Sequence, residues 1–132
     1  MKVQIQEVNR PNLNKRIYPT KVLQNAIEKY ITDFVKENRA FVCYKQPSKN
    51  MVDLTEVIGL VKSIRIEGEV VVSEIEQLKG VNESEKFWPL IEQGKMHVRT
   101  SGMGTITPQS DGTWVVGDDY ELISLFITTD PA

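Results

Sequence analysis

The feature that most restricts the possible folds is one apolar stripe with helical spacing. The rest of the chain is divided into short β-rich runs. Between residues 19 and 38, apolar residues recur as adjacent pairs every four positions, which places them along one face of a helix. Pro19 suits the first turn of this helix, because the N–H that proline lacks is not needed there. The pattern predicts one long N-terminal helix over 19–38 that packs on a core. The stripe consists of Val22, Leu23, Ala26, Ile27, Tyr30, Ile31, Phe34 and Val35.

The segments outside this helix favour β-strands. Two β-rich runs joined by Glu67-Gly68-Glu69 are typical of a hairpin. A short second helix is predicted to begin with Asn82 as its cap and to end before Gly94. The order of elements predicts a mostly β (α+β) fold, a small closed or curled β-barrel with one long N-terminal helix and one short helix. The expected strands cover 3–8, 40–44, 57–66, 70–77, 96–107, 113–116 and 120–128.

Length and composition exclude several classes of protein. With 132 residues the chain fits a single domain over 1–132. No apolar run approaches the roughly 20 residues that a membrane span requires, so we expect no membrane association. The single cysteine, Cys43, excludes an internal disulfide, and the single histidine, His97, leaves no Cys/His cluster for a metal. We therefore expect neither a metal nor an organic cofactor.

Charge is unevenly distributed along the chain. Residues 1–50 carry a net charge of +6 and residues 51–132 a net charge of −8, which leaves −2 overall. This division favours head-to-tail contacts between copies or binding to a charged partner, unless the two sets of charges interleave on one surface. The overall acidity argues against general duplex binding, which depends on many phosphate contacts, so we expect no specific nucleic acid partner.

Nucleophilic catalysis needs a base within hydrogen-bond reach of a hydroxyl or thiol, and His97 is the only imidazole in the chain. Ser101 follows it by four residues, a separation of about 13 Å along an extended strand, which is too far for direct proton transfer. Ser48 or Cys43 would have to reach His97 through the fold. We expect a structural or surface role for His97, and a buried thiol at Cys43. The glycines at 102 and 104 favour a bulge or tight bend over a phosphate cradle.

Five separated segments, taken together, resemble the prohead proteases of tailed phages. Residues 14–19, Asn-Lys-Arg-Ile-Tyr-Pro, are similar to the N-x-R-x-Y-P opening of that family. Residues 63–68 and 71–78 resemble its central hairpin, and 90–94 the end of the helix before its nucleophile strand. Residues 101–104, Ser-Gly-Met-Gly, resemble the end of its serine motif. Residues 120–124 and 130–132 resemble its closing strand and its D-P-[AS] end.

The resemblance implies a β-barrel like that of herpesvirus assemblin, with flanking helices. It also implies an origin among enzymes that process scaffold and capsid proteins inside immature phage heads. Active members carry a histidine before a proline in the segment after the first helix, and a nucleophile motif of the form G-I-S-S-R-G-x-G.

The catalytic positions of this chain depart from that pattern. Gln46-Pro47 matches the histidine and proline, and a glutamine has no useful basicity near neutral pH. Matching the motif on Gly102 and Gly104 places Arg99 at the serine, Thr100 beside it and Ser101 at the arginine. An arginine stays protonated and cannot attack a carbonyl group. The family's orienting acid would correspond to Asp119 or Glu121.

The leading hypothesis is a non-catalytic protease-fold protein that serves as an auxiliary or decoration component of a phage capsid. Its expected partners are the major capsid protein and copies of itself. Its expected locations are the phage head and, during assembly, the host bacterial cytoplasm. One alternative is an active prohead serine protease that uses a displaced set of His97, Ser101 or Ser48, and Glu121. Another is a pseudoprotease that regulates an active paralogue.

Overall fold

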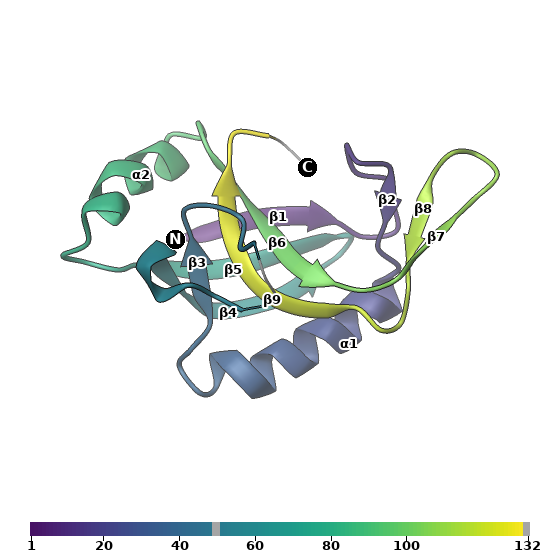
Figure 1. Ribbon diagram of the computed structural model, residues 1–132, viewed down its shortest axis with the longest axis horizontal. Helices are drawn as coiled ribbons and strands as arrows, with labels where there is room; N and C mark the ends of the chain where they lie inside the picture. The colour runs from purple at the N-terminus through teal and green to yellow at the C-terminus, as the bar shows by residue number, and fades with distance from the viewer. Residues whose placement is uncertain (49–50, 131–132) are drawn as a thin grey trace.

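The computed structural model describes residues 1–48 and 51–130, and its centre is a six-stranded sheet that curls into a half-barrel (Figure 1). The strand order is β1-β5-β4-β3-β9-β6, and all neighbours are antiparallel except β3 and β9, which run parallel. The curled, mostly β fold is as predicted. The strands are β1 (Lys2–Glu7), β3 (Phe41–Cys43), β4 (Val57–Glu67), β5 (Val70–Gln77), β6 (His97–Met103) and β9 (Glu121–Thr128).

Strands β4 and β5 form the predicted hairpin, and the turn between them depends on Gly68. This residue has φ of +64°, a left-handed conformation that costs glycine little and other residues more. Val70 pairs with Glu67 directly after the turn, and the ladder continues to Gln77 opposite Gly59. The hairpin is the longest paired region of the sheet, and the prediction of its position is confirmed.

Bulges bend the sheet so that its two edge strands, β1 and β6, approach each other. The register shifts between Gln4 and Gln6 in β1 and between Val61 and Ser63 in β4. It shifts again opposite Ser101 and Gly102 of β6, where Ile123 of β9 is the extra residue. A β-bulge increases the local twist and bends its strand. The seam between β1 and β6 is bridged by side chains, one of which donates from Thr100 to Gln6 over 2.6 Å.

The prediction of one long N-terminal helix over 19–38 is wrong. Helix α1 covers Thr20–Tyr30, and Ile31–Val35 then forms a wider π-helical turn, in which Lys36 N–H donates to Ile31 O. Apolar pairs spaced by four residues drift by about 40° per pair around a helix of 3.6 residues per turn. The wider turn offsets this drift, so that Phe34 and Val35 still pack against the core. Helix α1 packs against β4 and β9.

Helix α2 (Asn82–Glu92) covers one end of the sheet. The prediction of an Asn82 cap is wrong, because Val81 occupies the cap position and no side chain caps the helix. Trp88 is only 5% exposed and lies against β4, where Gly59 leaves room for its ring. Neither helix in the described ranges is long and apolar enough to cross a membrane.

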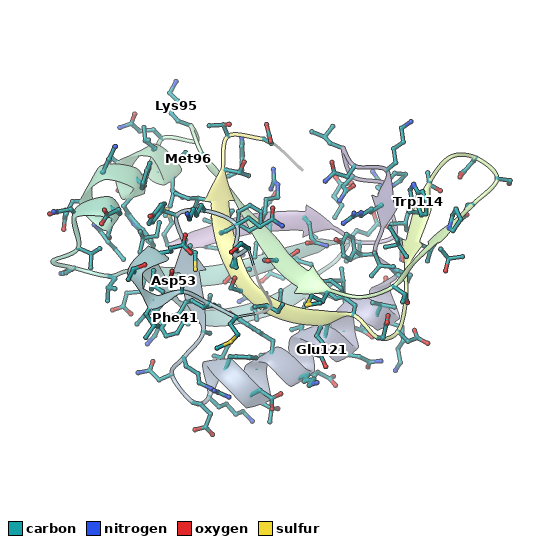
Figure 2. All side chains as sticks on the ribbon, viewed as in Figure 1. Phe41, Asp53, Lys95, Met96, Trp114 and Glu121 are labelled. Atoms are coloured by element: carbon teal, nitrogen blue, oxygen red, sulfur yellow. The ribbon has the colours of Figure 1, made fainter. Side chains whose placement is uncertain are left out.

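A small three-stranded sheet extends beyond the half-barrel (Figures 1 and 2). Its order is β2 (Arg16–Ile17), β8 (Trp114–Val116) and β7 (Ile106–Pro108), with β2 and β8 parallel. Trp114 on β8 is 39% exposed, whereas Val116 on the same strand is buried in the core. This sheet places Arg16, the first residue of β2, in a cleft that it lines together with Gln6 and Thr100 of the seam.

Candidate functional site

A polar cleft at the seam is lined by both residues that the sequence predicts to match the family's base and nucleophile, Gln46 and Arg99. Gln46 comes from the loop after β3, and Arg99 from β6, 53 residues later in the chain. Both line a cleft of about 390 Å³, although Gln46 itself is exposed to solvent. The other lining residues are Gln6, Asn12, Leu13, Asn14, Arg16, Tyr18, Thr100, Phe126, Thr128 and Asp130.

Among the residues that the structure describes, Arg99 donates to backbone carbonyl groups and to no carboxylate. Its Nη1 donates to Ile5 O and to Val98 O, both over 3.0 Å, and its Nη2 donates to Asp130 O over 2.8 Å. Partial burial lowers the pKa of Arg99 from its usual value, and the nearby Asp130 carboxylate opposes this shift. A guanidinium titrates so far above neutral pH that it remains charged, and it therefore offers only hydrogen-bond donors to the cleft.

Thr100 follows Arg99 on β6, and its hydroxyl belongs to the same cleft. Its Oγ1 donates to Gln6 Oε1 over 2.6 Å and accepts a longer bond of 3.5 Å from Tyr120 Oη. Tyr18 packs edge-on against Tyr120, with the ring centroids 5.4 Å apart. Burial raises the pKa of Tyr120 and that of Tyr18, so both phenols stay protonated at neutral pH. Neither an amide nor a protonated phenol can take the proton of Thr100.

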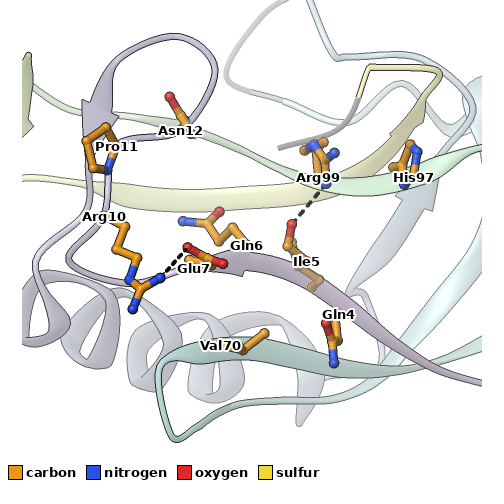
Figure 3. Close-up of a pocket in the computed structure, with 10 residues that line it drawn as sticks. All are labelled: Gln4, Ile5, Gln6, Glu7, Arg10, Pro11, Asn12, Val70, His97 and Arg99. Carbon is orange, nitrogen blue, oxygen red and sulfur yellow. Dashed lines mark hydrogen bonds and ion pairs between the residues drawn. The ribbon is translucent and has the colours of Figure 1, made fainter.

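The structure does not bring His97 and Ser101 together. His97 begins β6 and pairs with Thr128 of β9, whereas Ser101 pairs with Ser124. Ser101 is only 6% exposed, and it shares no hydrogen bond with His97 in the described part of the chain. His97 instead lines a second cleft of about 290 Å³, which β1 and the loop at Arg10 complete (Figure 3).

The other candidate residues do not form a catalytic group with His97 either. Ser48 is exposed beyond Gln46, and Cys43 is buried, with its pKa raised to about 11, mainly by that burial. Asp119 accepts hydrogen bonds from the backbone and the hydroxyl of Thr105, each over 2.9 Å.

Glu121 forms an ion pair with Lys29, with 2.7 Å between Oε1 and Nζ. Figure 2 shows Glu121 near helix α1, on the exposed side of β9. Neither Asp119 nor Glu121 therefore orients an imidazole in this arrangement. Within residues 1–48 and 51–130, no three His, Cys, Asp or Glu side chains gather where they could hold a metal ion.

Several residues of the cleft were not predicted from the sequence. Tyr18 lies in the N-x-R-x-Y-P segment that carried the family resemblance, so its presence at the site had a sequence signal. Gln6 had none, because it occupies an ordinary polar position in the opening strand. Phe126 was expected only as part of the closing strand.

A half-barrel with these motifs defines a protein of the phage capsid-protease class. Residues 2–129 match the family model described as prohead core protein serine protease, and the chain belongs to this family. It is 25% identical over 122 residues to the prohead core protein protease of Enterobacteria phage T4. That match covers 91% of this chain but 56% of the relative, so the chain spans about half of the curated relative's length.

The solved structure of the bacteriophage T4 capsid assembly protease, gp21, has the same fold. It superposes with a TM-score of 0.90 at 22% sequence identity, over 99% of this chain and 82% of that chain. The family relationship and the predicted protease-like fold are thereby confirmed.

Proposed function

We propose that this chain is a non-catalytic member of the prohead protease family that serves as an auxiliary or decoration component of a phage capsid. The observation that carries the proposal is the side-chain pair at the cleft. Gln46 and Arg99, which we match to the family's base and nucleophile, line the same cleft. Gln46 cannot accept a proton at neutral pH, and Arg99 donates its hydrogen bonds to three carbonyl groups.

The displaced alternative has less support. A dyad of His97 and Ser101 would need an imidazole nitrogen about 3 Å from the hydroxyl, whereas four residues of strand separate their backbones by about 13 Å. Ser101 is also 6% exposed, so a substrate carbonyl has little access to it. Residues that act as a unit lose nearly all covalent catalysis when one member is missing.

The role in the capsid follows from the family context. The T4 relatives are named for the prohead core and for capsid assembly, which favours association of this chain with a phage head and its proteins. We infer that its partners are the major capsid protein and other copies of itself. It would then reside in the phage head, and in the host bacterial cytoplasm during assembly.

A cleavage assay tests the loss of catalysis. The purified chain is incubated with the scaffold and major capsid proteins of its own phage, and products are identified by mass spectrometry. We expect no cleavage above that of a sample without the chain, and the T4 prohead protease acting on its own scaffold is the positive control. Cleavage that both His97→Ala and Ser101→Ala abolish would establish the active alternative instead.

Particle stoichiometry tests the structural role separately. Quantitative mass spectrometry of mature virions gives the number of copies of this chain relative to the major capsid protein. We expect many copies per particle, as a lattice component requires. Virions that contain none would contradict the structural role. Co-purification with a paralogue that has intact histidine and serine motifs would then favour the regulatory alternative.

A further inference from the structure

Arg99 connects three segments that are distant in the sequence. Its guanidinium donates to the carbonyl of Ile5 on β1, to that of Val98 on β6, and to that of Asp130 after β9. Figure 3 shows the side chain at the seam, with its bond to Ile5. Two of these bonds, to Ile5 and Asp130, thus join β6 to distant segments of backbone, and the bond to Val98 is local.

The first of these contacts closes a gap in the sheet. β1 and β6 are its two edge strands, and within the described ranges no backbone ladder joins them. Ile5 is the extra residue of the β1 bulge and has no register partner on β5, and its carbonyl accepts from Arg99. The bond between Thr100 and Gln6 bridges the same seam one residue further along each strand.

The third contact fixes the chain after β9. Asp130 and Thr128 both line the 390 Å³ cleft, so the segment that carries them forms one of its walls. Asp130 N–H is bonded locally, to Thr128 Oγ1 over 3.2 Å, whereas its carbonyl is bonded to Arg99 over 2.8 Å. The position of this wall is therefore tied to the same guanidinium as the seam.

We propose that Arg99 is a latch that holds the seam closed and, at the same time, holds the segment after β9 against the cleft. A serine at this position would have one hydroxyl donor and could not make all three bonds. In the family match proposed above, residue 99 is the nucleophile position, so the change that removes the nucleophile would also supply the latch. This device goes beyond the proposed function, because it concerns the opening of the half-barrel whether or not the chain is a capsid component.

Hydrogen–deuterium exchange of the full chain, followed by mass spectrometry, tests the latch. In Arg99→Ser we expect exchange at least tenfold faster than in the native chain, both in β1 (Lys2–Glu7) and in residues 127–130. The hairpin of β4 and β5 is the internal reference and should keep its rate. Arg99→Lys keeps the charge but has a single ammonium group, so its exchange rates should lie between those of the native chain and those of Arg99→Ser.

Two further variants show whether faster exchange depends on the three bonds of Arg99. Arg65→Ser removes an exposed arginine that pairs with Glu67 on the same sheet, and should change both segments less than twofold. Asp130→Ala keeps the carbonyl that accepts from Arg99, and should also leave β1 within twofold. If the β4–β5 hairpin also exchanges faster in Arg99→Ser, that variant has unfolded globally, and Arg99→Lys then provides the test. In whichever of these two variants stays folded, exchange within twofold of the native rate in β1 or in residues 127–130 would overturn the proposal.

Discussion

Gly102 and Tyr120 are packed so closely that no side chain fits at residue 102. A Cβ atom there would lie 2.5 Å from both Cζ and Oη of Tyr120, and equally close to Glu121 O. A Cβ atom added at Gly104, two residues further along, would contact the backbone and Cβ of the same tyrosine. The two glycines of the serine-like motif therefore make room for Tyr120 beside Thr100.

Gly102→Ala should destabilise the fold by about 2–3 kcal/mol, because the added methyl group would overlap the Tyr120 ring and Glu121 O and force these atoms to move. Urea unfolding followed by circular dichroism measures the change in the free energy of unfolding. Ser110→Ala, in the exposed turn of the β7–β8 hairpin, is the control and should stay within about 0.5 kcal/mol of the native chain. A Gly102→Ala variant as stable as this control would show that Tyr120 can shift freely.

Thr100→Val should cost about 1–2 kcal/mol of stability. Valine has nearly the shape of threonine, but it leaves Gln6 Oε1 without its 2.6 Å donor in a partly buried place. Thr129→Val, at an exposed position after β9, is the matched control with an expected change below about 0.5 kcal/mol. Equal stabilities of the two variants in urea would mean that the Thr100–Gln6 bridge does not stabilise the seam.

Alkaline pH should weaken the fold through Cys43. Burial raises its thiol pKa from 9.0 to about 11, so between these values the unfolded chain loses this proton while the folded chain keeps it. The free energy of unfolding is then unaffected below pH 9 and falls as the pH rises towards 11.

The stability gap between the native chain and Cys43→Ala should consequently narrow by up to about 1 kcal/mol from pH 9 to pH 10. Val42→Ala, at the neighbouring buried position, has no titrating group and should keep a constant gap over the same range. Urea unfolding at several pH values provides the comparison. A gap for Cys43→Ala that does not change with pH would indicate that the thiol keeps its ordinary pKa.

The two tryptophans should differ in their access to solvent. Trp88, on the buried face of helix α2, is 5% exposed, whereas Trp114 is 39% exposed on the small sheet. Acrylamide should therefore quench the fluorescence of Trp88→Phe, which retains Trp114, at least about threefold more efficiently than that of Trp114→Phe. Similar quenching constants for the two variants would contradict the burial of Trp88.

Local sequence patterns predicted the positions of the secondary-structure elements better than the geometry within and between them. Gly68 between two apolar runs is a local signal, and the β4–β5 hairpin forms where it was expected. The stripe from Val22 to Val35 also packs on the core, but a four-residue repeat does not by itself reveal whether the helix keeps its usual pitch. The π-helical turn at Ile31–Val35 is the adjustment that this mismatch required.

The cleft was predictable only through the family resemblance. Gln46 and Arg99 are 53 residues apart, and no periodicity connects them. The acceptors of Arg99 are backbone carbonyl groups, which every residue has, so its three contacts leave no mark in the sequence. Asp119 and Glu121 were considered as orienting acids through the family resemblance. Their bonds to Thr105 and Lys29 follow from the turn before β9 and from the packing of α1.

Pro108 limits what the outermost strand can do. In the β7 region, the backbone N–H and C=O groups of residues 105, 107 and 109 point towards β8. The bonds from Gly117 N to Thr105 O and from Gln109 N to Thr113 O show this alternation. The backbone groups of Ile106 and Pro108 therefore point outward. Proline has no N–H, which leaves Ile106 as the single outward donor of this strand. A strand from another molecule thus finds too few N–H donors to form a β-ladder with β7. Copies of the protein can therefore come into contact at this end without pairing their edge strands.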